Sequence, residues 1–486
     1  MDDGAETLGF AQRLSAVENS VYVPKFYDQP ARRYLRELAE AQRVVRLGDL
    51  IDEGQITVSA GHEIGKMAYG TGRHPFVRTS DLANWEIKAD PKQGVSQEIF
   101  DAFSARQDVS EGDMLFVRDG TYLIGTCALV SSLDEDIIFQ SHVLKFRVHE
   151  DAPITAEMLL LAMSTPIVQR QIRSKQFTAD IIDTIGNRYE QLLLPLPEKQ
   201  AEVERISRRV KEITEERARL REDARRIPFT IENRGSKVSK LALDDLAEVE
   251  LPSEYGSSIR SSQVQNGVYM PKYYSPSIEQ RLDNLEQTHT FPTLGDLSEN
   301  GVIALSTGDE VGKMAYGTGD LPFIRTSDFS NWELKSNPKQ SISAAEFDDL
   351  RKKQDVRAGD IFLVRDGTYL VGSSCMVVDQ DLPITYCGGM YRIRVLDEDQ
   401  MDPFLLFGAL NSPVARKQMR ARQFTRDVID TLGRRALEVK LPIPKSASDR
   451  ERAAAAVRRV VLRRAELRVD LGREVEVLDP LGGRLG

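Results

Sequence analysis

Apolar residues between positions 200 and 228 recur at alternating steps of three and four, the pattern of a helix that packs along one face. This seam consists of Val203, Ile206, Val210, Ile213, Leu220, Ala224 and Ile227. A second seam of the same rhythm lies near the end of the chain, at Ala453, Val457, Val460, Leu467 and Leu471. Each seam has an arginine at its odd position, Arg217 and Arg464. The pattern predicts two long helices that form an antiparallel coiled coil; the alternative is that each packs only on the residues before it.

The residues upstream of the first helix mix strand-like and helix-like patterns. Residues 113–125 predict two strands around an Asp-Gly turn, which is a strong hairpin signal. Residues 138–148 predict a further strand, and residues 156–175 predict a helix with a break at Pro166. The apolar run 192–197 predicts a strand that ends in prolines. Together these elements indicate an α+β module of roughly 180 residues.

The same module occurs twice, at a constant offset of 247 residues, as from Glu63 to Glu310. Of the 19 positions from 63 to 81, 15 are identical in residues 310–328. Repetition on this scale indicates two equal modules. We therefore predict these domains: a first module at 1–197, its helix at 198–228, a polar connector at 229–258, a second module at 259–444 and its helix at 445–486.

Composition narrows the class of protein. The chain has 486 residues, a net charge of −10 and three cysteines, and it lacks a run of about 18 apolar residues. We expect a cytoplasmic protein without a membrane segment, a disulfide framework or a wholly basic surface. A local basic stretch remains, with eight basic residues against three acidic ones between residues 414 and 440. It predicts either a solvated helix face or a phosphate-contacting one.

Duplication tests each chemical hypothesis, because an essential residue should recur in both copies. None of the five histidines or three cysteines recurs, so we expect no zinc site, no Cys–His nucleophile and no metal. Asp81, Glu86 and Lys88 do recur, as Asp328, Glu333 and Lys335, and could form a Mg²⁺-dependent nuclease site. The alternative that we favour is a turn capped by Asp81, with Glu86 and Lys88 on an exposed strand face.

Other repeated polar residues suit phosphate and base-edge contacts, because Arg binds guanine bidentately and hydroxyls and amides bond to bases or phosphates. Turns and buried ion pairs would explain the same residues. The candidate DNA-contacting residues of the first module are Lys66, Tyr69, Arg78, Thr79, Ser80, Arg118, Thr121, Tyr122, Lys175, Gln176 and Thr178. Those of the second module are Lys313, Tyr316, Arg325, Thr326, Ser327, Arg365, Thr368, Tyr369, Arg422, Gln423 and Thr425.

The two copies differ at two places where differences are expected if each copy recognises its own DNA sequence. Arg73-His74 becomes Asp320-Leu321, and Gln140-Ser141-His142 becomes Cys387-Gly388-Gly389.

The order module, long helix, module, long helix resembles the specificity (S) subunit of type I restriction–modification systems. Residues 112–120 and 359–367 are similar to the hairpin of that family's target recognition domains. Residues 184–187 leading to 194–200 resemble its exit into the conserved helix. The family's usual Pro-Pro-Leu-x-Glu-Gln is replaced here by Pro195-Leu196-Pro197-Glu198-Lys199-Gln200.

The resemblance implies a non-catalytic DNA-binding subunit with two α/β target recognition domains, each contacting one half of a bipartite site in double-stranded DNA. It implies partners: adenine methyltransferase (M) subunits, which use S-adenosylmethionine, and an ATP- and Mg²⁺-dependent restriction (R) subunit. No cofactor is expected on this chain. Because the two modules are alike, the two half-sites of the DNA target are expected to be similar and inverted. The resemblance also implies a role in phage defence. The alternatives are a repeat-built Mg²⁺-dependent endonuclease and a protein-interaction scaffold without a DNA role.

Overall fold

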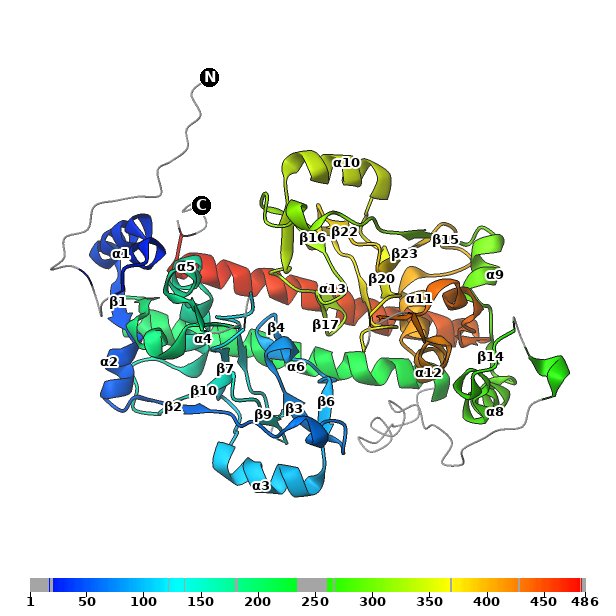
Figure 1. Ribbon diagram of the computed structural model, residues 1–486, viewed down its shortest axis with the longest axis horizontal. Helices are drawn as coiled ribbons and strands as arrows, with labels where there is room; N and C mark the ends of the chain where they lie inside the picture. Colours follow the sequence, from blue (N-terminus) through cyan, green and yellow to red (C-terminus); the bar gives the residue numbers. More distant parts are fainter. Residues whose placement is uncertain are drawn as a thin grey trace. The chain divides into compact units, whose positions relative to one another are not determined.

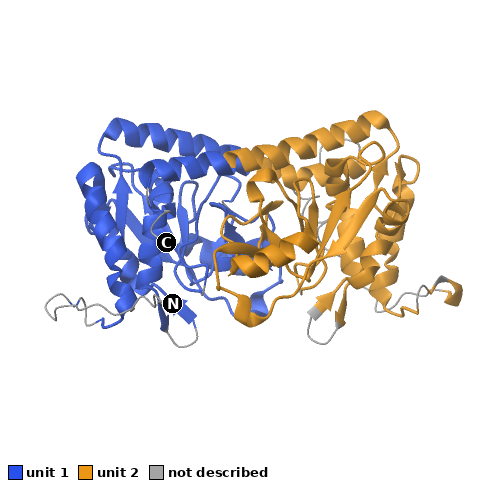
Figure 2. Ribbon diagram, turned by 90° about the horizontal axis from the view of Figure 1, so that it is seen from above, with its two compact units in different colours: residues 1–218, 468–486 blue, residues 219–467 orange. Residues whose placement is uncertain are grey.

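The structure is a computed structural model of the chain. It describes residues 17, 21–120, 122–134, 136–179, 182–233, 260–264, 267–367, 369–426, 429–480 and 482. The chain forms two compact units (Figure 2): unit 1 comprises residues 1–218 and 468–486, and unit 2 comprises residues 219–467. Among the described residues, none of the helices has the length and apolar character needed to span a membrane.

Unit 1 contains the first module (Figure 1). Its helices are α1 (Gln29–Ala41), α2 (Leu47–Asp52), α3 (Gln97–Gln107), α4 (Ala156–Ser164), α5 (Pro166–Lys175) and the start of α6 (Gln200–Asn233), with 3-10 turns η3 (Lys66–Ala68) and η4 (Thr79–Asp81). Its strands are β1 (Arg43–Arg46), β2 (Ile56–Ala60), β3 (His74–Val77), β4 (Leu82–Ala83), β5 (Glu86–Ile87), β6 (Gln93–Val95), β7 (Met114–Val117), β8 (Cys127–Leu129), β9 (Ile138–Phe139), β10 (Val143–Val148), β11 (Phe177–Ala179), β12 (Ile182–Thr184) and β13 (Leu193–Leu196).

Unit 2 contains the second module. Its helices are α8 (Pro276–Leu285), α9 (Leu294–Glu299), α10 (Ala344–Gln354), α11 (Pro403–Leu410), α12 (Pro413–Arg422) and most of α13 (Ala447–Leu478), with the 3-10 turn η8 (Lys313–Ala315). Its strands are β14 (His289–Thr290), β15 (Ile303–Thr307), β16 (Leu321–Ile324), β17 (Phe329–Ser330), β18 (Glu333–Leu334), β19 (Gln340–Ile342), β20 (Ile361–Val364), β21 (Ser374–Met376), β22 (Thr385–Tyr386), β23 (Met390–Val395), β24 (Phe424–Arg426), β25 (Ile429–Thr431) and β26 (Ile443–Pro444).

The sheets of the two units have the same strand order. Unit 1 has an antiparallel sheet β2-β10-β7-β8 and a mixed sheet β6-β3-β9, in which β3 and β9 are parallel. Unit 2 repeats these as β15-β23-β20-β21 and β19-β16-β22. The core of unit 1 includes Val77, Leu115 and Phe139, which are fully buried where the two sheets meet. The α+β fold class predicted from the sequence is therefore confirmed for both modules.

Local predictions were confirmed in kind and corrected in extent. The predicted helix break at Pro166 is confirmed: α4 ends at Ser164 and α5 begins at Pro166. Proline is accommodated in the first turn of a helix but not in its interior, so a new helix starts there. The predicted hairpin is β7–β8, but its connection spans residues 118–126 instead of a tight Asp-Gly turn. The predicted strand 138–148 is two strands, β9 and β10, separated by a turn at residues 140–142.

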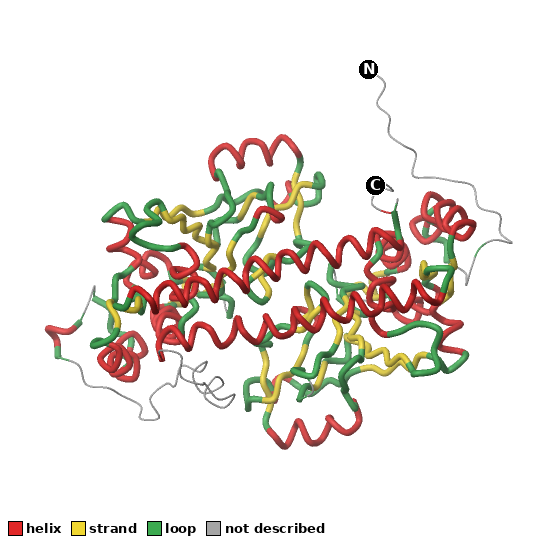
Figure 3. The backbone as a smooth tube through the Cα atoms, turned by 180° about the vertical axis from the view of Figure 1, so that it is seen from behind, coloured by secondary structure: helices red, strands yellow, loops and turns green. Residues whose placement is uncertain are grey.

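The two long helices run antiparallel. In unit 1, Arg209 of α6 pairs with Asp470 of α13 at 2.9 Å. In unit 2, Asp223 of α6 pairs with Arg459 of α13, also at 2.9 Å. Residue numbers thus rise along one helix as they fall along the other. Figure 3 shows both as long continuous helices, and α6 passes through Pro228, its predicted end, to Asn233. The first residues of the predicted connector 229–258 are therefore helical; residues 234–258 lie outside the described part.

The far end of each long helix binds the other module's polypeptide through a buried carboxylate. In unit 1, Asp479, just after α13, accepts hydrogen bonds from the Tyr34 hydroxyl and the Ile167 N–H, both at 2.7 Å. In unit 2, Glu232 of α6 accepts one from the Val414 N–H at 2.6 Å. Ile167 and Val414 stand at equivalent positions in the first turns of α5 and α12, where backbone donors lack helical partners. Each unit is thus completed by residues from both halves of the chain.

We expect Asp479→Ala to destabilise unit 1 by about 1–3 kcal/mol, because it leaves the buried Tyr34 hydroxyl and Ile167 N–H without their acceptor. The two tryptophans allow each unit to be followed separately, since Trp85 lies in unit 1 and Trp332 in unit 2. The measurement is urea unfolding by fluorescence in a Trp332→Phe background. Asp479→Asn, which keeps an acceptor oxygen, should lose less; equal losses would contradict the hydrogen-bonding role.

Candidate nucleic-acid interface

The duplicated motif forms a loop with a cation and an apolar side chain at its tip. Lys66 and Met67 lie in η3, and the Met67 side chain is 92% exposed. Lys313 and Met314 lie in η8, where Met314 is 90% exposed. Both lysines are exposed as well. The same large apolar side chain projects into solvent in both copies, so it does not contribute to the core of either unit.

The loop is firmly attached to the module. The Thr71 hydroxyl donates to the Ala68 carbonyl at 2.8 Å and accepts from the Ser96 N–H at 3.0 Å. A side chain at Gly72 would meet the Val95 carbonyl at 2.5 Å, so only glycine allows the loop to approach β6 this closely. The exposed tip is therefore presented from a fixed base.

An arginine stacked on a tyrosine lies beside this loop in each unit. The Arg78 guanidinium is 5.6 Å from the centroid of the Tyr69 ring, which in turn stacks on Phe76. In unit 2 the Arg325 guanidinium is 5.5 Å from the Tyr316 ring. The aromatic ring holds the cation in position without neutralising its charge.

The carboxylate nearest in sequence does not pair with this guanidinium. Asp81 accepts a hydrogen bond from the backbone N–H of Arg78 at 3.0 Å, and Asp328 does the same for Arg325 at 2.8 Å. Burial raises the pKa of the Asp81 carboxyl above its ordinary value, despite that backbone hydrogen bond. Within the described part of the chain, no carboxylate forms an ion pair with the Arg78 or Arg325 side chain. Both arginines remain available to an external anion or base. We call Lys66, Met67, Tyr69 and Arg78, with their unit 2 equivalents Lys313, Met314, Tyr316 and Arg325, the arginine–tyrosine surface.

A second arginine, by contrast, belongs to an internal network. Arg118 donates to Asp119 at 2.7 Å, and Asp119 also accepts from the Thr184 hydroxyl and lies 3.0 Å from His142 Nδ1. Burial opposes ionisation of Asp119, but these hydrogen bonds outweigh it and hold its pKa below the ordinary value. In unit 2, Arg365 pairs with Asp366 in the same way, at 2.9 Å. These pairs connect the β7–β8 loop to the β11–β12 hairpin.

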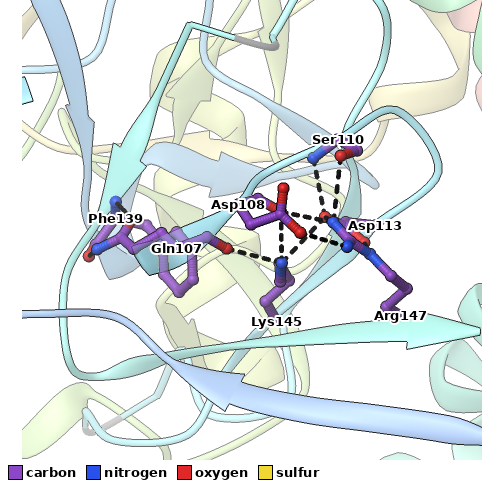
Figure 4. A network of polar contacts seen from close by, with 7 residues as sticks. All are labelled: Gln107, Asp108, Ser110, Asp113, Phe139, Lys145 and Arg147. Atoms are coloured by element: carbon purple, nitrogen blue, oxygen red, sulfur yellow. Dashed lines mark hydrogen bonds and ion pairs between the residues drawn. The ribbon is translucent and has the colours of Figure 1, made fainter. Parts of the chain in front are cut away.

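A network of buried polar groups fixes the strand that leads into the turn at 140–142 (Figure 4). The Gln107 side chain accepts from the Phe139 N–H at 2.7 Å and donates to the Phe139 carbonyl at 2.9 Å. Lys145 donates to the Gln107 carbonyl, and Arg147 donates to both carboxylate oxygens of Asp113. In unit 2, Gln354 makes the same pair of bonds to Tyr386.

The turn itself reaches the arginine–tyrosine surface. The Gln140 side-chain oxygen lies 3.5 Å from Arg78 Nε, and the Ser141 hydroxyl donates to Glu63 of the η3 loop. In sequence terms Arg78, Glu63 and Ser141 are far apart. The fold therefore brings the duplicated loop, the stacked arginine and the turn that differs between the copies onto one surface within the unit.

The other predicted contacts are placed less favourably. Lys175, Arg422 and Gln423 are buried, with Lys175 over the Phe26 ring and Arg422 over the Tyr273 ring. Gln176 and Thr178 bond to Asp183, and Gln423 and Thr425 bond to Asp430, so they brace the hairpins β11–β12 and β24–β25. The remainder are half-buried: Thr79, Ser80, Tyr122, Thr326, Ser327 and Tyr369. Thr121 and Thr368 lie outside the described residues.

The carboxylates of the hypothetical nuclease site are committed to structural contacts. Glu86 is buried, and its Oε1 lies 3.4 Å from Nη2 of Arg217; Glu333 and Arg464 make the equivalent pair at 2.6 Å. The prediction that Glu86 lies on an exposed strand face was therefore wrong. Glu86 is buried because it meets the arginine at the odd position of the heptad seam. No group of three or more potential ligands within the described residues is placed to hold a metal ion.

The predicted contacts omit Met67 and Met314. The candidate residues are chosen for charge or hydrogen-bonding groups, and residue type alone does not distinguish a buried methionine from a projecting one. One signal could have identified them: an apolar residue retained in both copies of an otherwise glycine-rich, polar loop.

No protein-family model matches this chain, and no curated protein matches it. Solved structures are similar to it, among them three from type I restriction–modification systems. The type I restriction–modification S subunit from M. genitalium is 12% identical, with a TM-score of 0.33 and coverage of 91% of this chain and 95% of that chain. The HsdS subunit from Thermoanaerobacter tengcongensis is 17% identical, with a TM-score of 0.25 and coverage of 91% and 95%. A chain from a structure on complex assembly and conformational transition of the type I R-M system is 16% identical, with a TM-score of 0.27 and coverage of 91% and 96%.

Proposed function

We propose that this chain is the non-catalytic, DNA-binding specificity subunit of a type I-like restriction–modification complex. Each unit contacts one half of a bipartite target in double-stranded DNA through its arginine–tyrosine surface. One observation carries the proposal: in both units an arginine is held on a tyrosine ring, has no carboxylate in an ion pair among the described residues, and adjoins an exposed lysine and methionine.

This combination suits DNA better than it suits an acidic protein surface. A guanidinium fixed by stacking can form two parallel hydrogen bonds to a guanine edge or to a phosphate, and a flexible lysine neutralises backbone phosphates. A projecting methionine side chain can contact base faces from the minor groove. The net charge of −10 confines attraction for DNA to such local surfaces. Because the arginine–tyrosine surface occurs once in each unit, the chain has two such surfaces, one for each half-site of the DNA.

The long helices serve as the spacer between half-sites in this proposal. Each is about 50 Å long at 1.5 Å per residue, and their antiparallel pairing as a coiled coil would fix the separation of the two half-sites. We propose that residues 1–197 and 259–444 are its two DNA-contacting parts, and that α6 and α13 are its spacer. Adenine methyltransferase subunits would dock on the helices and supply S-adenosylmethionine chemistry, with a restriction subunit as a further partner, in the cytoplasm.

Selection of bound duplexes from a random DNA library tests the proposal. The sample is this chain in complex with an adenine methyltransferase subunit of a type I-like system. We expect enrichment of one bipartite motif with two similar, inverted half-sites at a fixed spacing. Affinity for it should fall as salt rises, because phosphate contacts release counterions. The proposal fails if no motif is enriched, or if the purified chain methylates or cleaves DNA by itself.

A further inference from the structure

The turn between β9 and β10 is a place where residues beside the arginine–tyrosine surfaces differ between the two units. In unit 1 it is Gln140-Ser141-His142, and in unit 2 it is Cys387-Gly388-Gly389. Five polar residues around it are the same in both copies: Glu63, Arg78, Arg118, Asp119 and Thr184 correspond to Glu310, Arg325, Arg365, Asp366 and Thr431. A constant polar frame therefore surrounds a variable centre.

In unit 1 the centre carries two side chains that present hydrogen-bonding groups to solvent. His142 lies with Nδ1 3.0 Å from Asp119 and Nε2 3.9 Å from Glu63, and its side chain is 34% exposed. The Ser141 hydroxyl donates to the same glutamate. The imidazole covers Asp119, whose side chain is only 10% exposed. The outer edge of the ring is thus oriented by carboxylates on both sides.

In unit 2 the positions of Ser141 and His142 are taken by Gly388 and Gly389, and Cys387, the remaining residue of the turn, is buried. A Cβ at Gly389 would lie 3.1 Å from Thr326 Cγ2, and a Cβ at Gly388 would lie 2.9 Å from Glu310 Oε1. The Asp366 side chain is 26% exposed, more than twice the value for Asp119. The Arg365–Asp366 pair of unit 2 is therefore accessible to a ligand, whereas His142 covers the equivalent Arg118–Asp119 pair of unit 1.

We propose that these two turns are specificity determinants, and that they make the two half-sites differ at the base pairs they face; this rests on the proposed function. In unit 1, His142 and Ser141 hydrogen-bond to base edges in the groove. In unit 2 the glycine turn lets the duplex approach the backbone, and the facing base meets the Arg365–Asp366 pair. Elsewhere the constant frame selects the same bases in both half-sites.

A second difference between the copies offers a matched control. Unit 1 has His74 where unit 2 has Leu321, but the His74 ring stacks on Phe100 of α3 at 4.3 Å. Its Nε2 lies 2.9 Å from Oε1 of Gln97, also on α3. His74 therefore serves the packing of α3, and His74→Leu replaces a unit 1 residue by its unit 2 counterpart without changing the turn.

The test is motif selection from a random duplex library with three forms of the methyltransferase complex: the natural chain, Ser141→Gly with His142→Gly, and His74→Leu. The natural chain should select half-sites that differ at one or two positions. The double-glycine chain should select two identical inverted half-sites, so that its target becomes palindromic. The double-glycine chain should bind its selected target with an affinity within about tenfold of that of the natural chain for the natural target. A difference of this size corresponds to the loss of one base contact. His74→Leu should select the natural target.

An unchanged motif from the double-glycine chain would overturn the inference while leaving the proposed function intact. So would natural half-sites that are already identical. A natural chain that selects no motif at all would instead refute the proposed function. A general loss of binding by the double-glycine chain to every duplex, with circular dichroism and unfolding unchanged, would also count against it, since the turn would then supply affinity and not selectivity.

Discussion

Replacing Glu86 with alanine is expected to destabilise unit 1 by about 3–5 kcal/mol, the usual cost of removing one partner from a buried ion pair. Arg217 is almost fully buried within the helix seam, and Glu86 Oε1 lies 3.4 Å from its Nη2. An arginine side chain keeps its charge in a protein interior. The charge would stay in the interior without this carboxylate.

A second substitution distinguishes this cause from simple loss of packing. Glu86→Ala combined with Arg217→Met removes both charges and places an apolar side chain in the seam. The double variant should recover most of the lost stability, since apolar replacements for buried ion pairs are often neutral or stabilising. Urea unfolding followed through Trp85, in the Trp332→Phe background, reports on unit 1. Equal losses in the single and double variants would show that the ion pair is not the source of the effect.

The equivalent pair in unit 2 serves as the internal control. Glu333→Ala should lower the stability of unit 2 in the same way, because Arg464 is fully buried and 2.6 Å from Glu333. Here the unfolding is followed through Trp332 in a Trp85→Phe background. The Glu86 variant should leave that signal at its natural midpoint. This independence would fail if the two units unfolded as one cooperative body.

The sequence predicted what depends on local periodicity and on repetition. The heptad seams gave the long helices, the constant offset gave the twin modules, and Pro166 marked the boundary between α4 and α5. Each of these signals arises from residues close together in the chain, where backbone sterics and the amphipathic pattern decide the outcome. The arginine at the odd seam position was visible too, but its partner was not, because Glu86 is 131 residues away.

What the sequence could not give is the set of contacts between distant segments. Asp479 and Glu232 look like ordinary residues near the ends of charged helices, yet they bind the first turns of α5 and α12. The turn Asn84-Trp85 was also hidden: both residues have positive φ, a conformation that asparagine tolerates and tryptophan seldom adopts. It places Glu86 at the start of β5, from where its side chain meets Arg217.

The candidate site shows the same division. Lys66, Tyr69 and Arg78 were identified because they recur, and the structure places them together on one surface. Recurrence could not separate them from Gln176 and Thr178, which recur because they brace a hairpin. Duplication preserves structural residues as firmly as functional ones, so only the direction in which a side chain points could distinguish the two classes.

The double substitution Arg78→Ala with Arg325→Ala is expected to weaken specific DNA binding by about 1–3 kcal/mol for each arginine, or about 5- to 150-fold per half-site. The reason is the loss of a pre-positioned guanidinium from each arginine–tyrosine surface. The fold should persist, since Asp81 and Asp328 bond to the backbone N–H groups of these residues and not to their side chains. Fluorescence anisotropy with the selected duplex measures the change in Kd.

The double variant Arg78→Lys with Arg325→Lys distinguishes a contact to phosphates from a contact to bases. Lysine keeps the charge but loses the planar fork and its stacking on Tyr69 and Tyr316. If the arginines contact only phosphates, the lysine variant should bind every duplex nearly as well as the natural chain does. If they contact bases, it should keep its affinity for unrelated duplexes while losing its preference for the selected target. We expect the second result, because a cation held rigidly on an aromatic ring is better suited to a directional base edge than to a diffuse phosphate charge. Full binding and full selectivity in the alanine variant would place the DNA contact elsewhere in the two units.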